Sequence, residues 1–91
     1  MNSADYDKET IEKAEAAAKS YLKNNYEDIK SIEIEKIFKG PLGGLNVEGT
    51  VNEKYFFNLD VEQPDFNIGS IGVRKGFPKK KAECKEKDCD Y

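Results

Sequence analysis

The feature that most constrains the fold is an apolar–polar alternation in three segments that follow one another along the chain. In residues 31–38 (SIEIEKIF), isoleucines alternate with glutamates until the phase breaks at Ile37 and Phe38, a break typical of a β-bulge. Residues 45–51 (LNVEGTV) and 54–61 (KYFFNLDV) resume the alternation. Because successive side chains of a strand point to opposite faces, this period predicts three half-buried strands.

Residues 7–24 (DKETIEKAEAAAKSYLKN) predict one amphipathic helix before the strands. The segment is rich in good helix formers. Its apolar residues recur at steps of three and four, at Ile11, Ala14, Ala18, Tyr21 and Leu22. Three residues are candidate N-caps, namely Ser3, Asp5 and Asp7. Asn24 and Asn25 mark the expected end of the helix.

Residues 66–73 (FNIGSIGV) predict a weaker fourth strand, because two glycines lower its strand propensity. Asn52 and Glu53 form the expected tip of the second hairpin. The fold class is therefore α+β, with one N-terminal helix packed on a three- to four-stranded antiparallel sheet in a single domain of residues 1–75. Residues 76–91 are charged and poor in apolar side chains, which predicts a flexible, disordered tail without regular structure.

Composition excludes several functional classes. The 91 residues fit one domain, and 18 acidic against 15 basic side chains give a net charge of -3, which does not favour nucleic-acid binding. No window approaches the roughly 18 consecutive apolar residues of a membrane span. Histidine is absent, which removes catalytic triads and histidine-rich zinc sites. We expect no enzymatic activity, no cofactor and no metal.

The glycine cluster at residues 40–44 (GPLGG) has two interpretations. A phosphate-binding loop needs a helix after its glycines, because the helix N-terminus supplies unpaired amides and a positive dipole. Here a predicted strand follows, and the sequence does not match GxxxxGK. The cluster therefore predicts a hairpin turn, in which Pro41 sets its own φ and a neighbouring glycine takes a positive φ.

Three polar groups of side chains suggest chemistry but have simpler explanations. Cys84 and Cys89 form either a small disulfide ring or two free thiols, and their spacing is not the CxxC redox motif. An acidic group near the third strand does not have the calcium-loop spacing and predicts a solvated turn; it comprises Asp60, Glu62, Asp65 and Asn67. The lysine run at residues 79–81 is flanked by acidic residues and predicts a solvated tail.

The sheet face turned away from the helix is the most informative surface. By the alternation it carries an acidic field around one exposed aromatic ring, made up of Glu33, Glu35, Asn46, Glu48, Thr50, Phe56, Asn58 and Asp60. An antiparallel sheet often has one solvated face. The functional alternative is a protein-binding face, with Phe56 as the apolar anchor and the carboxylates selecting a basic partner.

A helix ending in YLKNNYEDIKSIEIEKI, followed by GPLGGLNVEGTVN and a YFFNLDV strand, resembles a family of small uncharacterised lipoproteins of Gram-positive bacteria, a domain family of unknown function. The resemblance covers residues 14–73. It implies a cystatin-like fold and anchoring outside the membrane through a lipidated N-terminal cysteine. This chain begins MNSADYD, so either the signal and cysteine were removed or this member is not lipidated. Cystatins carry a QxVxG protease-binding motif on the first hairpin, and that motif is absent.

These observations favour a noncatalytic extracytoplasmic domain that binds an unknown protein partner at the cell envelope. Its expected contacts are on the acidic sheet face, at Glu33, Glu35, Glu48, Phe56 and Asp60. The alternative function is an inhibitor or immunity-type regulator of a secreted enzyme or toxin, acting through Pro41 and Leu42 of the hairpin loop. Because a small open sheet leaves two unpaired edges, the chain is expected to be a monomer or a weak edge-strand dimer.

Overall fold

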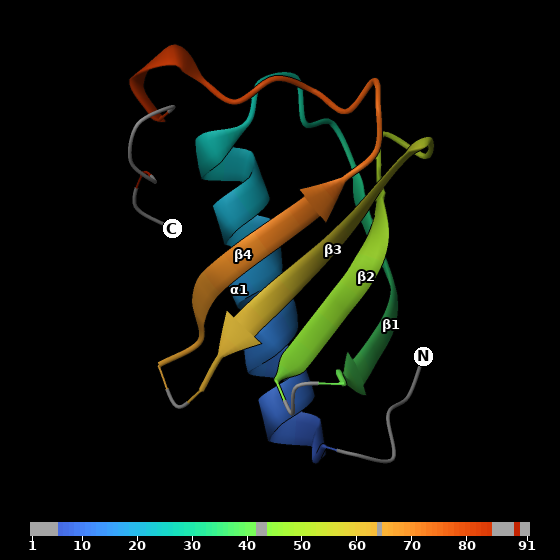
Figure 1. Cartoon of the computed structure of the whole chain (residues 1–91), viewed down its shortest axis with the longest axis vertical. Helices are drawn as coiled ribbons and strands as arrows, with labels where there is room; N and C mark the ends of the chain where they lie inside the picture. The colour runs from blue at the N-terminus through green and yellow to red at the C-terminus, as the bar shows by residue number, and fades with distance from the viewer. Residues whose placement is uncertain (1–5, 42–43, 64, 85–88, 90–91) are drawn as a thin grey trace.

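One helix packs on one face of a four-stranded antiparallel sheet (Figure 1). The computed structural model describes residues 6–41, 44–63, 65–84 and 89. The elements are α1 (Lys8–Asn25), β1 (Ile32–Lys39), β2 (Leu45–Val51), β3 (Tyr55–Glu62), β4 (Asn67–Val73) and a short 3-10 helix, η1 (Ala82–Cys84). The strand order is β1-β2-β3-β4, so every strand pairs with its neighbours in sequence. The α+β fold class is confirmed, and the weaker fourth strand is present.

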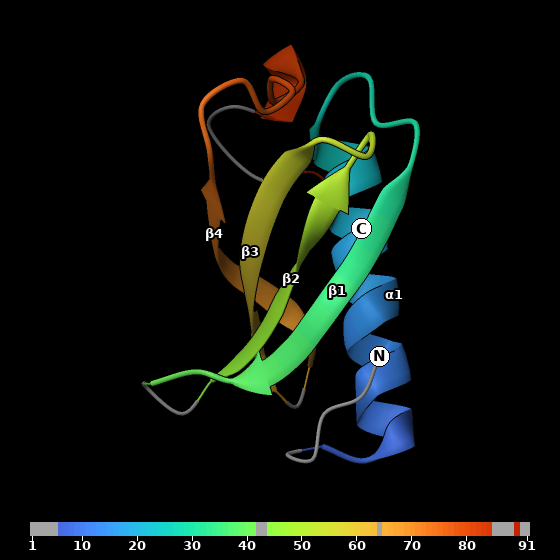
Figure 2. The same cartoon turned by 90° about the vertical axis from the view of Figure 1, so that its right-hand side faces the viewer.

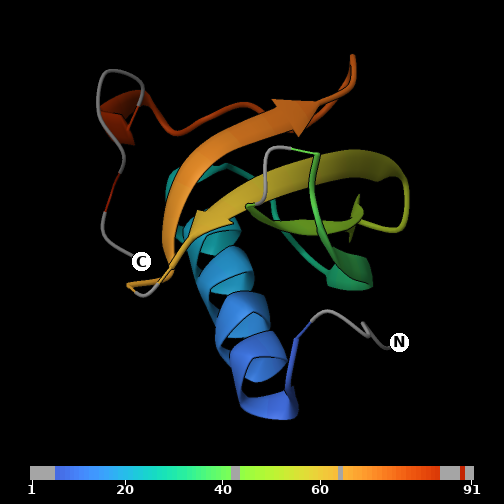
Figure 3. The ribbon, with the colours of Figure 1, turned by 60° about the horizontal axis from the view of Figure 1, so that its bottom comes forward.

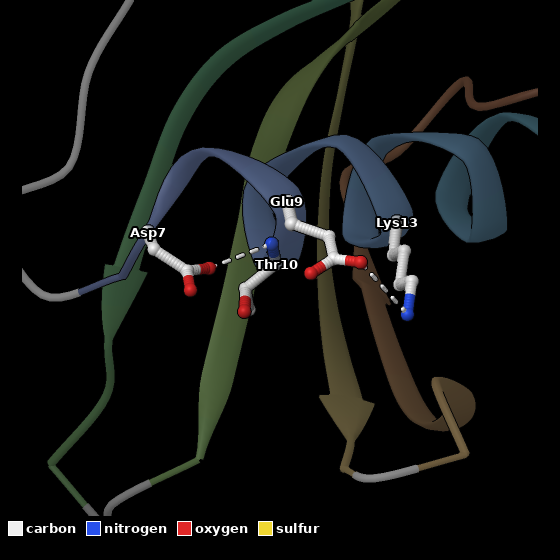
Figure 4. Close-up of polar contacts among 4 residues, drawn as sticks. All are labelled: Asp7, Glu9, Thr10 and Lys13. Carbon is white, nitrogen blue, oxygen red and sulfur yellow. Dashed lines mark hydrogen bonds and ion pairs between the residues drawn. The ribbon is translucent and has the colours of Figure 1, made fainter.

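The start of α1 follows from its capping residue. The Asp7 carboxylate accepts a hydrogen bond from the Thr10 backbone N–H at 2.8 Å, and Glu9 pairs with Lys13 one turn further along at 3.6 Å (Figure 4). Hydrogen bonds from the side chain and then the backbone of Thr10 hold the pKa of Asp7 below its ordinary value. Asp7 is therefore the N-cap, and the other two candidates lie outside the described residues.

The core lies between α1 and the inner face of the sheet, which arches over the helix (Figure 3). From α1 it includes Ala14, Ala18, Tyr21 and Leu22. From the sheet it includes Ile37, Leu45, Val47, Val51, Phe57, Leu59 and Val61. Burying each of the larger side chains stabilises the fold by about 1.5–3 kcal/mol relative to leaving it exposed. The helical and strand periodicities predicted these positions, apart from Ile37.

A β-bulge in β1 explains the exception. Ile34 pairs with Gly49 of β2 and Lys36 pairs with Glu48, so Glu35 is an extra residue without a partner across the strand pair. One extra residue reverses the in-and-out phase of everything that follows it in the strand. Ile37 therefore lies in the core, although the earlier alternation would have placed it outside.

Gly49 is the residue that fits the bulge. It is buried in the middle of β2, and a Cβ atom added there would run into the backbone carbonyl of Glu33 and lie 3.1 Å from the Cα of Ile34. No side chain can move aside, because all of these neighbours are backbone atoms of β1. A glycine inside a strand often marks such a close approach of two backbones.

The second hairpin turns at Asn52 and Glu53, as the sequence predicts. Both residues have positive φ, 52° and 63°, and the Lys54 N–H donates to the Val51 carbonyl at 3.1 Å. This is the type I′ geometry that suits the twist of a hairpin.

The Asn52 side chain also stabilises the α1–β1 connection. Its Oδ1 accepts hydrogen bonds from the N–H groups of residues 30 and 31 at 2.7 and 3.2 Å, and its Nδ2 donates to the carbonyl of residue 28 at 2.8 Å.

After β4 the chain crosses the C-terminal end of α1 (Figure 1). Tyr26 and Lys80 form an antiparallel bridge, and the Phe77 ring packs edge-on against Tyr26 with centroids 5.3 Å apart. The expectation of no regular structure from residue 76 onward is therefore wrong at this bridge and at η1. Residues 85–88 and 90–91, to which the same expectation applies, lie outside the described residues.

A disulfide joins Cys84 and Cys89, whose Cα atoms are 5.3 Å apart. Cys84 is fully buried, in contrast to the exposed tail position that its polar neighbours suggest. The buried side chain of Asn25 binds the second cysteine: its Oδ1 accepts from the Cys89 N–H at 2.6 Å, and its Nδ2 donates to the Cys89 carbonyl at 3.3 Å and to the Tyr21 carbonyl at 3.0 Å. The disulfide is thus attached to the end of the helix.

Candidate functional site

We define the outer face as the side of the sheet that points away from α1. The strand register places these residues on it: Glu33, Lys36 and Phe38 of β1; Asn46, Glu48 and Thr50 of β2; Phe56, Asn58 and Asp60 of β3; and Ser70 and Gly72 of β4. The residues form cross-strand rows, in which Thr50 lies opposite Phe56, Glu48 opposite Asn58, and Asn46 opposite Asp60.

The structure places four of the five expected contact residues together on the outer face, namely Glu33, Glu48, Phe56 and Asp60. The fifth, Glu35, is the extra residue of the bulge and pairs with nothing on β2. The bulge also brings Lys36 and Phe38 to this face, which sequence reasoning missed. The phase break at Ile37 was the signal that could have found them, because a bulge reverses every later position in the strand.

Two cation–aromatic contacts change the chemistry expected of this face. The Lys36 ammonium lies 4.8 Å from the centroid of Phe38, and the Arg74 guanidinium lies 4.9 Å from that of Phe56. Each such contact is worth about 0.5–1 kcal/mol at an exposed site. Phe56 is half-buried rather than a bare exposed ring, and the outer face mixes both signs of charge. The picture of one aromatic ring in an acidic field is therefore wrong.

A hollow of about 310 Å³ lies where the β1–β2 connection meets the outer face. Its lining combines the two surfaces that sequence reasoning treated as alternatives: Gly40, Pro41 and Gly44 from the connection, and Asn46, Asn58, Asp60 and Ser70 from the strands. The described ends of the connection project from the sheet on the side away from α1 (Figure 2). Leu42, the other loop residue of the predicted site, lies outside the described residues.

The glycines at the ends of the connection let it approach the sheet closely. A Cβ atom at Gly40 would collide with the side-chain nitrogen of Asn46, and one at Gly44 would lie 2.8 Å from Oδ1 of Asp60. Neither glycine has a positive φ, and Gly43 lies outside the described residues. The predicted hairpin turn is present, but these two glycines serve close approach and not the positive φ that was expected.

Hydrogen bonds engage one N–H of each of the two side-chain amides that line the hollow. Asn46 Nδ2 donates to the Gly44 carbonyl at 3.1 Å, and Asn58 Nδ2 donates to Glu48 Oε2 at 2.9 Å. The side-chain oxygens of Asn46 and Asn58 and the carboxylate of Asp60 accept no hydrogen bond from any described residue. The hollow therefore presents acceptors and can take a ligand that supplies donors.

Within the described residues, no group of three or more histidine, cysteine, aspartate and glutamate side chains could hold a metal ion. In the same part of the chain, no helix is long and apolar enough to cross a membrane. A comparison of the chain with family models, curated proteins and solved structures finds no match. Function must therefore be inferred from the geometry of the outer face.

Proposed function

We propose that this protein is a noncatalytic binding domain that recognises a protein partner through the outer face and the β1–β2 connection, acting as one surface. The observation that carries the proposal is the shared hollow, because Pro41 from the connection and Asn58, Asp60 and Ser70 from the strands line the same depression. Concave sites with a few convergent polar groups are where proteins place specific contacts. The volume is at the small end of the roughly 300–1,000 Å³ of ligand pockets, which suits a side chain of a partner.

The chain's expected location is outside the cytoplasm, at the cell envelope. The disulfide between Cys84 and Cys89 supports this location, because disulfides persist mainly in oxidising compartments. The resemblance to envelope lipoproteins points the same way. In this proposal a lipid anchor holds the protein at the membrane, as that resemblance implies.

An inhibitor or immunity-type regulator of a secreted enzyme or toxin is the second candidate. The described ends of the β1–β2 connection project from the sheet (Figure 2), which favours this candidate because a projecting connection can enter a partner's cleft. Both candidates use the same surface and differ in the partner. An enzyme or toxin whose activity falls when this domain binds would favour the second.

A site-specific photo-crosslink tests the proposal. A photoreactive phenylalanine replaces Ser70, which is exposed and lines the hollow, and in a matched control it replaces Glu12, which is exposed on α1. Each variant is added to the cell-envelope fraction of the source organism and irradiated. We expect a protein adduct at position 70 that is absent at position 12, and the purified partner should bind the unmodified domain. Identical adducts at both positions, or none at position 70, would reject the proposal.

A further inference from the structure

We infer that the hollow on the outer face binds an arginine side chain of the partner. This inference rests on the proposed function, since it names the group that the same surface recognises. It starts from the balance of donors and acceptors around the hollow. One N–H of each of the Asn46 and Asn58 side chains already donates to Gly44 or Glu48, whereas the side-chain oxygens have no partner among the described residues and are open to a ligand.

The acceptors are concentrated on two neighbouring strands. Asn46 of β2 lies directly opposite Asp60 of β3, and Asn58 is two residues before Asp60 on the same face. Directly opposed side chains have Cβ atoms about 4.5–5.5 Å apart, and diagonal ones lie about 7–8 Å apart. Three acceptor groups at these separations match a wide, flat donor better than a point donor.

Arginine is the protein side chain with that form. Its guanidinium is planar and carries five N–H donors and no acceptor, whereas a lysine ammonium has three donors at one point. A carboxylate such as Asp60 can accept two parallel N–H bonds from it. Asn58 and Asn46 then provide oxygens for the remaining donors.

Charges already on the chain leave Asp60 available to such a ligand. Lys36 and Arg74, the cations at the outer face, lie over Phe38 and Phe56, and neither pairs with Asp60. Gly44 brings the backbone of the connection close to the Asp60 carboxylate, so the anion lies at the wall of the hollow. An incoming cation therefore meets a carboxylate without an ion-pair partner in the described part of the chain.

Three short peptides test the inference: acetyl-Gly-X-Gly-amide in which X is arginine, lysine or citrulline. Citrulline has nearly the shape of arginine but is neutral, and an acceptor oxygen replaces one of its NH2 groups. Titration into ¹⁵N-labelled protein, followed by NMR, should give a dissociation constant on the order of 1 mM for the arginine peptide. The shifts should centre on the side-chain amides of Asn46 and Asn58 and on the Gly44 N–H.

The variants Asp60→Asn and Glu53→Gln provide the matched comparison. Both remove one carboxylate without changing its shape, but Glu53 lies at the opposite hairpin tip. We expect Asp60→Asn to bind the arginine peptide at least tenfold more weakly than wild type, and Glu53→Gln to bind it as wild type does. The lysine and citrulline peptides should bind wild type at least tenfold more weakly than the arginine peptide. The NMR spectrum of Asp60→Asn outside the hollow reports whether the variant is folded; if it is not, the Ser70→Ala variant takes its place, with a loss of at least threefold expected.

Three outcomes would overturn the inference. The first is equal affinity for the arginine and citrulline peptides, or for the arginine and lysine peptides. The second is no binding of the arginine peptide up to 20 mM, roughly twentyfold above the expected dissociation constant. The third is a crosslinked partner that binds wild type and Asp60→Asn equally well. In that third case the proposed function stands, because the partner still binds this surface, and only arginine recognition fails.

Discussion

Replacing Gly49 and Gly72 by alanine should have opposite effects on stability, although both glycines lie in the same sheet. Neither residue has a positive φ, so alanine is compatible with both backbones. At Gly72 the nearest atom to an added Cβ is a backbone oxygen 4.0 Å away, which is ordinary contact. There the substitution mainly reduces the entropy of the unfolded chain and should stabilise by about 0.4–1 kcal/mol.

At Gly49 the same methyl group meets the backbone of β1. The Glu33 carbonyl stands in its way, and Ile34 Cα would lie only 3.1 Å from it. Overpacking of this kind costs about 1–3 kcal/mol even when side chains can adjust, and here the β1 backbone itself must shift at its bulge. We expect Gly49→Ala to lose about 2–3 kcal/mol of unfolding free energy, or roughly 10–20 °C in melting temperature for a domain of this size.

Urea denaturation followed by far-UV circular dichroism measures both free energies, provided that the slope m is the same for wild type and variants. The comparison within one sheet removes the general effect of adding a methyl group. If Gly49→Ala unfolds within about 0.5 kcal/mol of wild type, the account of the bulge as a close backbone contact is refuted. A larger loss at Gly72 than at Gly49 would refute it equally.

Three further predictions concern the second hairpin turn, the attachment of the disulfide to α1 and the N-cap of α1. Asn52→Ala should lower the free energy of unfolding in urea by about 2 kcal/mol, because it removes the three hydrogen bonds to residues 28, 30 and 31. Glu53→Gly should raise it by about 0.5 kcal/mol, because glycine takes a positive φ without steric cost, and equal stability of both variants would contradict this. Asn25→Leu should speed tryptic cleavage after Lys81 and lower the free energy of unfolding by about 2 kcal/mol, because the Cys89 backbone loses its hydrogen-bond partner. The control Asn24→Ala, which changes an exposed side chain, should have neither effect, and unchanged cleavage of Asn25→Leu would contradict the attachment of the disulfide to α1. Because the pKa of Asp7 is lowered in the folded protein, its carboxylate stabilises the fold fully above the ordinary pKa of about 4, and this contribution is lost as the pH falls through the lower folded value. Wild type should therefore lose more stability on acidification than Asp7→Asn. Parallel curves of stability against pH for the two proteins would contradict the role of Asp7 as the N-cap.

Sequence reasoning succeeded where one local pattern decides the structure. The period of two in residues 45–51 gives the bounds of β2 without error, and the step of three and four places Ala14, Ala18 and Leu22 in the core. Asn52 and Glu53 were recognised as a hairpin tip because two residues separate two alternating runs. In these segments, local propensity and tertiary packing favour the same structure.

The errors have a common physical origin, which is contact between segments far apart in the sequence. The bulge at Glu35 depends on Gly49 of the next strand, and it moved Lys36 and Phe38 onto the outer face. The charged tail looked unstructured by composition, yet Asn25 binds Cys89 across 64 positions. The hollow also joins a connection and three strands, so no single stretch of sequence carries its signal.

The most direct test of the central claim is the affinity of the purified partner for two single variants. Pro41→Ala changes the β1–β2 connection, and Asn58→Ala changes the sheet, but both residues line the same hollow. If the connection and the outer face act as one surface, each variant should weaken binding about fivefold or more, which corresponds to the 1 kcal/mol that marks an important interface residue. Loss of affinity in only one of them would mean that the two surfaces act separately and would contradict the account.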